Sequence, residues 1–194
     1  MAGVSVTGLA PRITTPFRGV RAEDAGLGIV AVDLGYSASK PTCGIAWAAN
    51  ETGCEEMFGA AIERVASILA QVGSGLLVIE AVLSTYHDAT GNPDIRGDFE
   101  RGRGWYYGPG AVSAIAAQRF LQSLANKLPE KFQPIPIAEA FLSFKKTRTR
   151  HSDDAAAILR GFSQPRPERL RIGTEPLSNL VLDVPEVRVF KASD

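Results

Sequence analysis

The sequence is poor in the features that disulfide-stapled, secreted or membrane-spanning proteins require. Its two cysteines, Cys43 and Cys54, are too few for a disulfide framework and lack a metal-type spacing, so we expect reduced, buried thiols. No apolar run approaches the roughly 20 residues that a membrane-spanning helix needs. The N-terminus also lacks the long apolar region of a signal peptide. We therefore expect a cytoplasmic protein that makes no membrane contact.

Net charge is absent as well, because 21 basic residues balance 21 acidic residues. The total charge therefore argues neither for nor against a polyanionic partner. With 194 residues, of which 45% are hydrophobic, the chain suits one globular domain of ordinary size. We find no internal repeat and no low-complexity tract that would divide it further.

The sequence does contain two apolar segments that end on an acid. The segment Gly28–Ser37 (GIVAVDLGYS) predicts a buried strand that ends near Asp33, and Gly35 allows a tight exit. Leu76–Glu80 (LLVIE) predicts a second strand of this kind. A carboxylate at the end of a buried strand is costly unless a metal ion, a basic side chain or backbone amides pair with it. Taken alone, Asp33 is equally well explained as a capped or salt-bridged structural residue.

The residues between these two segments predict how they are connected. Pro41–Trp47 and Cys54–Phe58 are expected strands, separated by a polar turn, and Ala60–Val72 has the spacing of an amphipathic helix. A strand, a helix and a second strand in this order favour parallel pairing of the two acid-ended strands. Asp33 and Glu80 would then lie at the edge where open α/β sheets bind their ligands.

The second half of the chain adds further helices, a strand and more acids. We expect a helix over Gly110–Lys127, a strand over Gln133–Ala140 and a helix over His151–Gly161 with Ser152 as its N-cap. Extended segments are expected at Leu180–Val184 and Val187–Lys191. The acid in the predicted strand, Glu139, is either a further carboxylate near a site or simply a charge at the end of a strand.

The late helix begins with Asp153 and Asp154, which would stabilise the helix dipole even without any further role. Together with Asp33 and Glu80, however, they offer the oxygen ligands that Mg²⁺ prefers. Two such ions about 3.5–4 Å apart activate a water and stabilise the leaving oxygen of a phosphodiester. Asp33 would bridge the ions. His151 shares a helix face with Asp154, so it either serves the site or is an exposed residue at the helix start.

The order of strands, helices and acids resembles the RNase H-like, retroviral-integrase-type nuclease superfamily. Within it, VDLGYS with CGIAW, LLVIEA and HSDDAAAIL resemble the RuvC-type Holliday-junction resolvases, whose last motif places an acid or a histidine three residues before an aspartate. VIEAVLS, IAEAF and HSDDAAAI are similar to a family of uncharacterised predicted nucleases of the same fold. The resemblance covers roughly residues 27–162, and Tyr36–Pro41 departs from the resolvases' glycine-rich first motif.

The resemblance implies an α/β fold with a mixed sheet of about five strands, the first three antiparallel and the others parallel, flanked by helices. It implies a catalytic domain over 26–162. Outside that range, the composition of the chain predicts a flexible arm over 1–25 and a C-terminal extension over 163–194 that packs on or wraps the domain. The resemblance also implies phosphodiester hydrolysis with two Mg²⁺ or Mn²⁺ ions. The implied catalytic residues are Asp33, Glu80, His151 and Asp154, and the implied metal ligands are Asp33, Glu80, Asp154 and Asp153, of which we prefer Asp154 to Asp153.

Local charge favours a nucleic-acid partner, with DNA favoured over RNA. Between Ala140 and Ile172, eight basic residues stand against three acidic ones. Basic residues also lie among the aromatics of the long polar segment Ser84–Gly110, a mixture that suits phosphate contact and base stacking. The expected contacts are Arg96, Arg101, Arg103, Lys145, Lys146, Arg148 and Arg150. The alternatives are a solvated charged face and a surface loop pinned by its aromatics.

Two other functions fit parts of the sequence. The first is a non-catalytic nucleic-acid-binding or assembly module of the same fold. The second is an actin- or sugar-kinase-like phosphotransferase, because DLGYS resembles that phosphate loop, although that fold needs two such domains. Junction cleavage requires two symmetric nicks and therefore a homodimer, for which Gly110–Lys127 could supply the interface.

Overall fold

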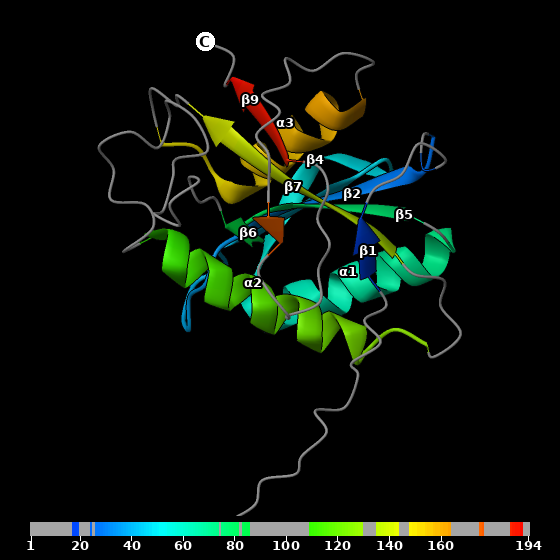
Figure 1. The fold of residues 1–194 in the computed structure, drawn as a ribbon, viewed down its shortest axis with the longest axis horizontal. Helices are drawn as coiled ribbons and strands as arrows, with labels where there is room; N and C mark the ends of the chain where they lie inside the picture. The colour runs from blue at the N-terminus through cyan, green and yellow to red at the C-terminus, as the bar shows by residue number, and fades with distance from the viewer. Residues whose placement is uncertain are drawn as a thin grey trace, which may run out of the picture.

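A mixed β-sheet with helices on both faces forms the centre of the protein in the computed structural model (Figure 1). The structure describes residues 17–19, 24, 26–73, 75–81, 83–85, 109–129, 135–143, 148–163, 175–176 and 187–191. Several predicted features lie outside the described residues: Arg96, Arg101, Arg103, Lys145, Lys146 and the extended segment Leu180–Val184. In the described part of the chain, none of the helices is long and apolar enough to cross a membrane.

Five strands make up the core of the sheet, and their order confirms the predicted fold class. In spatial order they are β4 (Asn50–Glu56), β3 (Cys43–Trp47), β2 (Gly28–Leu34), β5 (Gly75–Glu80) and β7 (Ile135–Ser143). The first three of these five strands in chain order, β2, β3 and β4, pair in antiparallel fashion, whereas β5 runs parallel to β2 and β7 runs parallel to β5. This is a 3-2-1-4-5 arrangement, which is consistent with RNase H-like topology.

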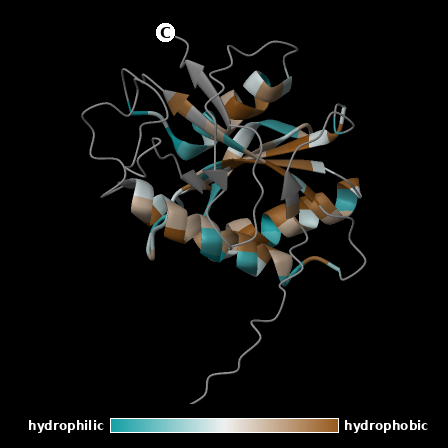
Figure 2. Ribbon diagram, in the orientation of Figure 1, coloured by the Kyte–Doolittle hydropathy of each residue, from teal (hydrophilic) through white to brown (hydrophobic). Residues whose placement is uncertain are grey.

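The helices cover the two faces of the sheet with different kinds of side chain. Helices α1 (Phe58–Val72) and α2 (Pro109–Ala125) pack on one face, against large residues such as Val30 and Ile79. Helix α3 (His151–Ser163) packs on the other face (Figure 1). That face is built largely of alanines, namely Ala31, Ala46, Ala138 and Ala140 on the strands and Ala155 and Ala156 on the helix. Small residues allow α3 to approach the sheet closely, and Figure 2 shows the apolar strands between the helix layers.

The edge strand β4 begins and ends earlier in the chain than predicted. The strand was expected at Cys54–Phe58 after a polar turn, but it begins at Asn50, and Phe58 already belongs to α1. Polar residues are acceptable there because β4 is the last strand on its side of the described sheet, and its first residues are largely exposed. The backbone pairing with β3 forms the strand, whereas burial of side chains contributes little.

Two short strands extend the other side of the sheet. Strand β1 (Phe17–Gly19) pairs with the start of β7, and β9 (Val187–Lys191) pairs with its end, both in parallel. A piece of the expected N-terminal arm and a piece of the expected C-terminal extension thus add to the same sheet edge, and Phe17 is buried in the core. A separate two-stranded ladder joins β6 (Ser84–Thr85) to β8 (Glu175–Pro176). The domain boundaries themselves stay a prediction.

Candidate metal centre

Three of the predicted carboxylates converge at one edge of the sheet. Asp33 is the penultimate residue of β2, Glu80 ends β5, and Asp154 lies in the first turn of α3. Each offers an oxygen that lies within 4.8 Å of the others. Asp33 and Asp154 are buried, at 7% and 6% exposure, and Glu80 is partly buried. The sequence prediction that these three side chains meet is therefore matched by the structure.

Strand register and alternation explain why the first two meet. Asp33 lies directly beside Glu80 in the parallel pairing of β2 with β5. Successive side chains point to opposite faces of a strand, so Asp33 shares a face with Ala31, and Glu80 shares a face with Val78. Ala31 and Val78 both pack beneath α3. Both carboxylates therefore point toward the face where α3 begins.

Two glycines let the start of α3 lie directly on the sheet. A Cβ atom added at Gly44, the residue opposite Asp33 on β3, would overlap the backbone of His151. A Cβ atom at Gly53 would lie 2.7 Å from the carbonyl oxygen of Ser152, and Gly53 has a positive φ of 75°. This close backbone approach brings Asp154 within reach of the two strand-end carboxylates.

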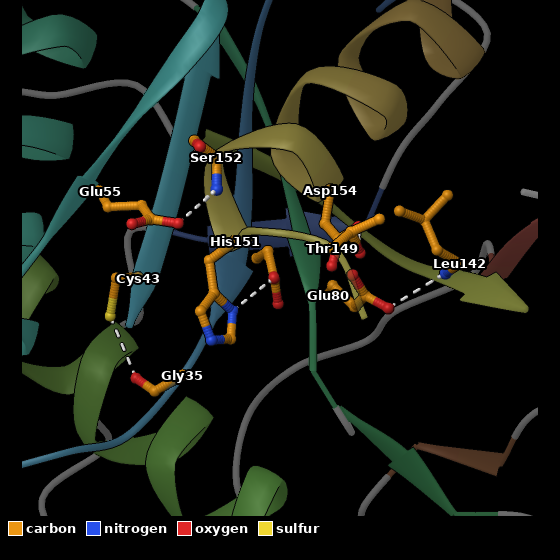
Figure 3. A network of polar contacts seen from close by, with 10 residues as sticks. Gly35, Cys43, Glu55, Glu80, Leu142, Thr149, His151, Ser152 and Asp154 are labelled. Carbon is orange, nitrogen blue, oxygen red and sulfur yellow. Dashed lines mark hydrogen bonds and ion pairs between the residues drawn. The ribbon is translucent and has the colours of Figure 1, made fainter. Parts of the chain in front are cut away.

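At least one oxygen of each of the three carboxylates is held by a group of the protein, and Figure 3 labels Glu80 and Asp154 beside their partners. The contacts are His151 Nδ1 with Asp33 Oδ2 at 2.6 Å, the Leu142 amide with Glu80 Oε1 at 3.0 Å, and the Thr149 hydroxyl with Asp154 Oδ1 at 2.6 Å. Contacts of this kind orient metal-binding side chains from outside the ligand shell. In Figure 3, Glu80 and Asp154 lie next to each other, close to His151.

His151 thus lies at the site, in contact with Asp33. The hydrogen bond to Asp33 raises the pKa of His151, partial burial opposes this, and the charges of Asp33, Asp154 and Glu55 raise it further. The protonated imidazole is therefore more favoured here than in an unperturbed histidine. The side chain of His151 is 36% exposed, so solvent reaches the imidazole.

The structure corrects the predicted N-cap of α3. The helix begins at His151, and the amides of Asp153 and Asp154 donate to the carbonyl of Arg150, so Ser152 lies inside the first turn and is buried. The amide of Ser152 donates instead to Glu55 on β4, at 3.4 Å. The free amides of a helix start need acceptors, and here the acceptor comes from the edge strand.

Glu55 is the residue at the site that the sequence did not reveal. It also forms an ion pair with Arg150 at 3.4 Å. Partial burial raises the pKa of Glu55, but the hydrogen bonds from Arg150 and from the Ser152 amide outweigh it and hold the pKa below its usual value. Because Glu55 and Ser152 are 97 residues apart, no local sequence pattern could have linked them.

The other acids that were considered lie away from the cluster. Asp153 is exposed, whereas its neighbour Asp154 is buried, so among the described residues only Asp154 of this pair joins the cluster. Glu139 is fully buried, but it shares a strand face with Ile137, on the side of α1 and α2. There its Oε2 accepts a hydrogen bond from the amide of Leu83 at 3.2 Å. It is therefore buried beneath the opposite helices rather than at the metal centre.

Two of the predicted nucleic-acid contacts lie beside the cluster. Arg148 and Arg150 immediately precede α3, and both are exposed. Arg150 is 71% exposed even though it pairs with Glu55, so it remains accessible to a polyanion. The start of α3 therefore places positive charge next to the three carboxylates.

The spacing of the carboxylate oxygens suits a divalent cation. Mg²⁺ binds oxygen at about 2.0–2.1 Å, so opposite ligands are about 4.2 Å apart, and for Ca²⁺ the corresponding value is about 4.6–5.2 Å. The span of 4.8 Å therefore needs at most a small contraction to ligate one ion. A bound cation would also offset the mutual repulsion of three clustered carboxylates. The residues present thus fit a metal site.

Comparisons of the chain with models of protein families, with curated proteins and with solved structures found no match. The fold class consequently depends on the observed strand order, and the candidate metal centre depends on the geometry of Asp33, Glu80 and Asp154.

Proposed function

We propose that the protein is a metal-dependent nuclease that hydrolyses phosphodiester bonds of structured DNA or RNA. The observation that carries this proposal is the convergence of Asp33, Glu80 and Asp154 at the carboxyl edge of an RNase H-like sheet. Three acids from three separate elements are costly to gather unless a cation neutralises them. Ligands of open α/β sheets bind at this edge.

In this proposal Asp33, Glu80 and Asp154 would hold Mg²⁺ or Mn²⁺, with Asp33 as the ligand shared if two ions bind. Bound ions would supply an activated water and stabilise the leaving oxygen. His151 holds one oxygen of Asp33 through Nδ1, which leaves its second nitrogen to exchange a proton with water or with the leaving oxygen. Thr149 and the Leu142 amide keep the other two carboxylates oriented.

The proposed substrate is nucleic acid, with DNA favoured over RNA. Arg148 and Arg150 are exposed beside the cluster and would contact the phosphate backbone. Lys145, Lys146, Arg96, Arg101 and Arg103 are proposed to extend this contact. The narrower form of the proposal is a RuvC-like junction resolvase, which would act as a homodimer. A four-way junction therefore belongs among the substrates tested.

The decisive experiment compares Asp33→Asn with Asp153→Asn. Mn²⁺ binding is measured by calorimetry, and cleavage is measured on single-stranded, duplex, branched and RNA–DNA hybrid substrates. We expect Asp33→Asn to lose Mn²⁺ binding and cleavage while it still binds nucleic acid, because the bridging ligand is gone. Asp153→Asn removes a charge from an exposed residue next to Asp154. This variant should therefore retain Mn²⁺ binding, cleavage and nucleic-acid binding. Absence of both metal binding and cleavage in the wild-type protein would refute the proposal.

One observation favours a second candidate, a non-catalytic nucleic-acid-binding module. Nδ1 of His151 contacts Asp33 at 2.6 Å, and the raised pKa of His151 favours a positive charge among the acids without any metal. In such a module the imidazolium would take over the neutralising role of the cation. The same experiment separates the two, because the module would bind nucleic acid but neither bind Mn²⁺ nor cleave.

A further inference from the structure

Residues 35–42 form the loop that connects β2 to β3, and it begins two residues after Asp33. Hydrogen bonds and backbone packing hold the loop in place. At its base, the Cys43 thiol donates a hydrogen bond to the carbonyl of Gly35 at 3.1 Å. Burial raises the pKa of Cys43 to about 12, so the thiol keeps the proton that it donates. A Cβ atom at Gly35 would overlap the backbone of Thr42, so the two ends of the loop touch. Within the loop, Ser37 Oγ accepts hydrogen bonds from two nearby backbone amides.

This loop presents an aromatic ring to solvent. Tyr36 is 65% exposed, although its ring packs edge-to-face on Phe58, with 4.9 Å between centroids and an interplanar angle of 89°. Phe58 packs in the same manner on Phe120, which is fully buried. Three rings thus run from the core to the surface. An isolated exposed tyrosine needs no explanation, but one anchored through two rings has already lost much of its side-chain freedom.

The contact with Phe58 leaves ring surface available for a ligand. An edge-to-face contact occupies at most one face of either ring, so at least one face of Tyr36 is not covered by Phe58. A nucleobase that stacks on an aromatic ring gains affinity without regard to sequence, because every base has a π-face. An ordered ring is a better stacking partner than a mobile one, because less entropy is lost on binding.

The backbone of Tyr36 also lies close to that of Asp33, whereas its ring packs on Phe58 at the start of α1, on the face of the sheet opposite α3. Three residues of chain span at most about 11 Å, so the Cα atoms of Tyr36 and Asp33 are no further apart than this. Stacked bases follow one another at about 3.4 Å, and the two side chains add to the Cα separation, so the Tyr36 ring lies within a few nucleotides of the carboxylates. In a continuous duplex both faces of each base are covered by neighbouring bases. Only an unpaired or displaced base offers a free face to Tyr36.

We propose that Tyr36 is a stacking platform for an unpaired nucleobase a few nucleotides from the bond that is cut. The inference rests on the proposed nuclease function and narrows its substrate class. Strands with unpaired bases, whether single-stranded, bulged or branched, would be bound in preference to a continuous duplex.

The test uses two substitutions of Tyr36 in the full-length Asp33→Asn protein, which would not cut its ligand. Tyr36→Leu keeps apolar packing on Phe58 but lacks a ring, whereas Tyr36→Phe keeps the ring. A matched control is Val72→Ala, which trims a side chain that is 46% exposed at the far end of α1. Binding is measured by fluorescence anisotropy with a single strand and a duplex, and stacking is measured by quenching of 2-aminopurine in the single strand.

We expect Tyr36→Leu to weaken single-strand binding at least about fivefold and to abolish the quenching. Tyr36→Phe and Val72→Ala should retain both, and duplex binding should be the same in all variants. If Tyr36→Leu binds and quenches like its parent, this inference is wrong and the nuclease proposal stands. If the wild-type protein binds neither nucleic acid nor Mn²⁺, the proposed function fails and the inference fails with it.

Discussion

At the scale of single residues, the site is defined as much by the groups around the carboxylates as by the carboxylates themselves. Asp33, Asp154 and Glu80 each have one oxygen fixed by a protein group, and the start of α3 is in turn fixed by Glu55. The ion pair of Glu55 with the exposed Arg150 contributes little by itself. The acceptor that Glu55 offers to the helix amides is the more valuable contact, because unpaired helix-start amides are costly.

This role of Glu55 predicts a pH-dependent contribution to stability. Because the pKa of Glu55 is lowered in the folded protein, its contribution is present above the usual value of about 4.5 and is lost as the pH falls through the folded value. Glu55→Gln should therefore lower the free energy of unfolding by about 1 kcal/mol at pH 7, and the difference should shrink toward zero in acid. Urea unfolding between pH 7 and pH 3 measures this. Glu51→Gln, at an exposed position of β4, is the control. A difference for Glu55→Gln that does not vary with pH would contradict the prediction.

At the scale of elements, the important feature is how closely α3 approaches the sheet. Its first turn lies on Gly44 and Gly53, and the sheet face beneath it is composed largely of alanines. The carboxylate of Asp154 reaches Asp33 and Glu80 only because the helix backbone comes so near. The position of one helix start therefore determines whether the cluster forms.

Gly44→Ala tests this dependence. The added methyl would overlap the backbone of His151, which cannot rotate away as a flexible side chain can, so the start of α3 must shift. We expect a loss of about 1–3 kcal/mol in the free energy of unfolding and at least about tenfold weaker Mn²⁺ binding. Gly28→Ala is a matched control, because Gly28 also lies in a strand and an added Cβ meets nothing within 4 Å. Unchanged Mn²⁺ affinity in Gly44→Ala would show that the approach of α3 is not needed.

The elements also show what could be predicted from the sequence. Acid-ended apolar runs and the helix between them were sufficient to predict that Asp33 and Glu80 end neighbouring parallel strands. The full strand order was predicted only from the resemblance to the RNase H-like fold. The strand Val187–Lys191 was also placed correctly. The acceptor Glu55 and the strand Phe17–Gly19 were missed, because each depends on a partner more than 90 residues away. The N-cap at Ser152 was wrong for the same reason, since a distant side chain supplies the acceptor.

At the scale of the whole molecule, the candidate metal centre joins parts that are far apart in the chain. Its ligands come from β2, β5 and α3, which contribute to the same packed layer on one face of the sheet. An ion held by all three would bind the folded chain and not the unfolded one. Metal binding should therefore appear as added stability of the entire fold, independently of any catalytic activity.

The last prediction follows from this linkage. At an Mn²⁺ concentration about 100 times the dissociation constant, the added stability is about 2.7 kcal/mol, which raises Tm by roughly 5–10 °C in a chain of this size. Asp154→Asn should abolish the increase, because it removes one ligand while an oxygen remains to accept the Thr149 hydroxyl. In chelator the same variant should be at least as stable as wild type, because one of three clustered charges is gone. Asp153→Asn should keep the full Mn²⁺ effect. Thermal unfolding with chelator and with Mn²⁺ separates these outcomes, and an Mn²⁺ effect that survives in Asp154→Asn would place the metal elsewhere.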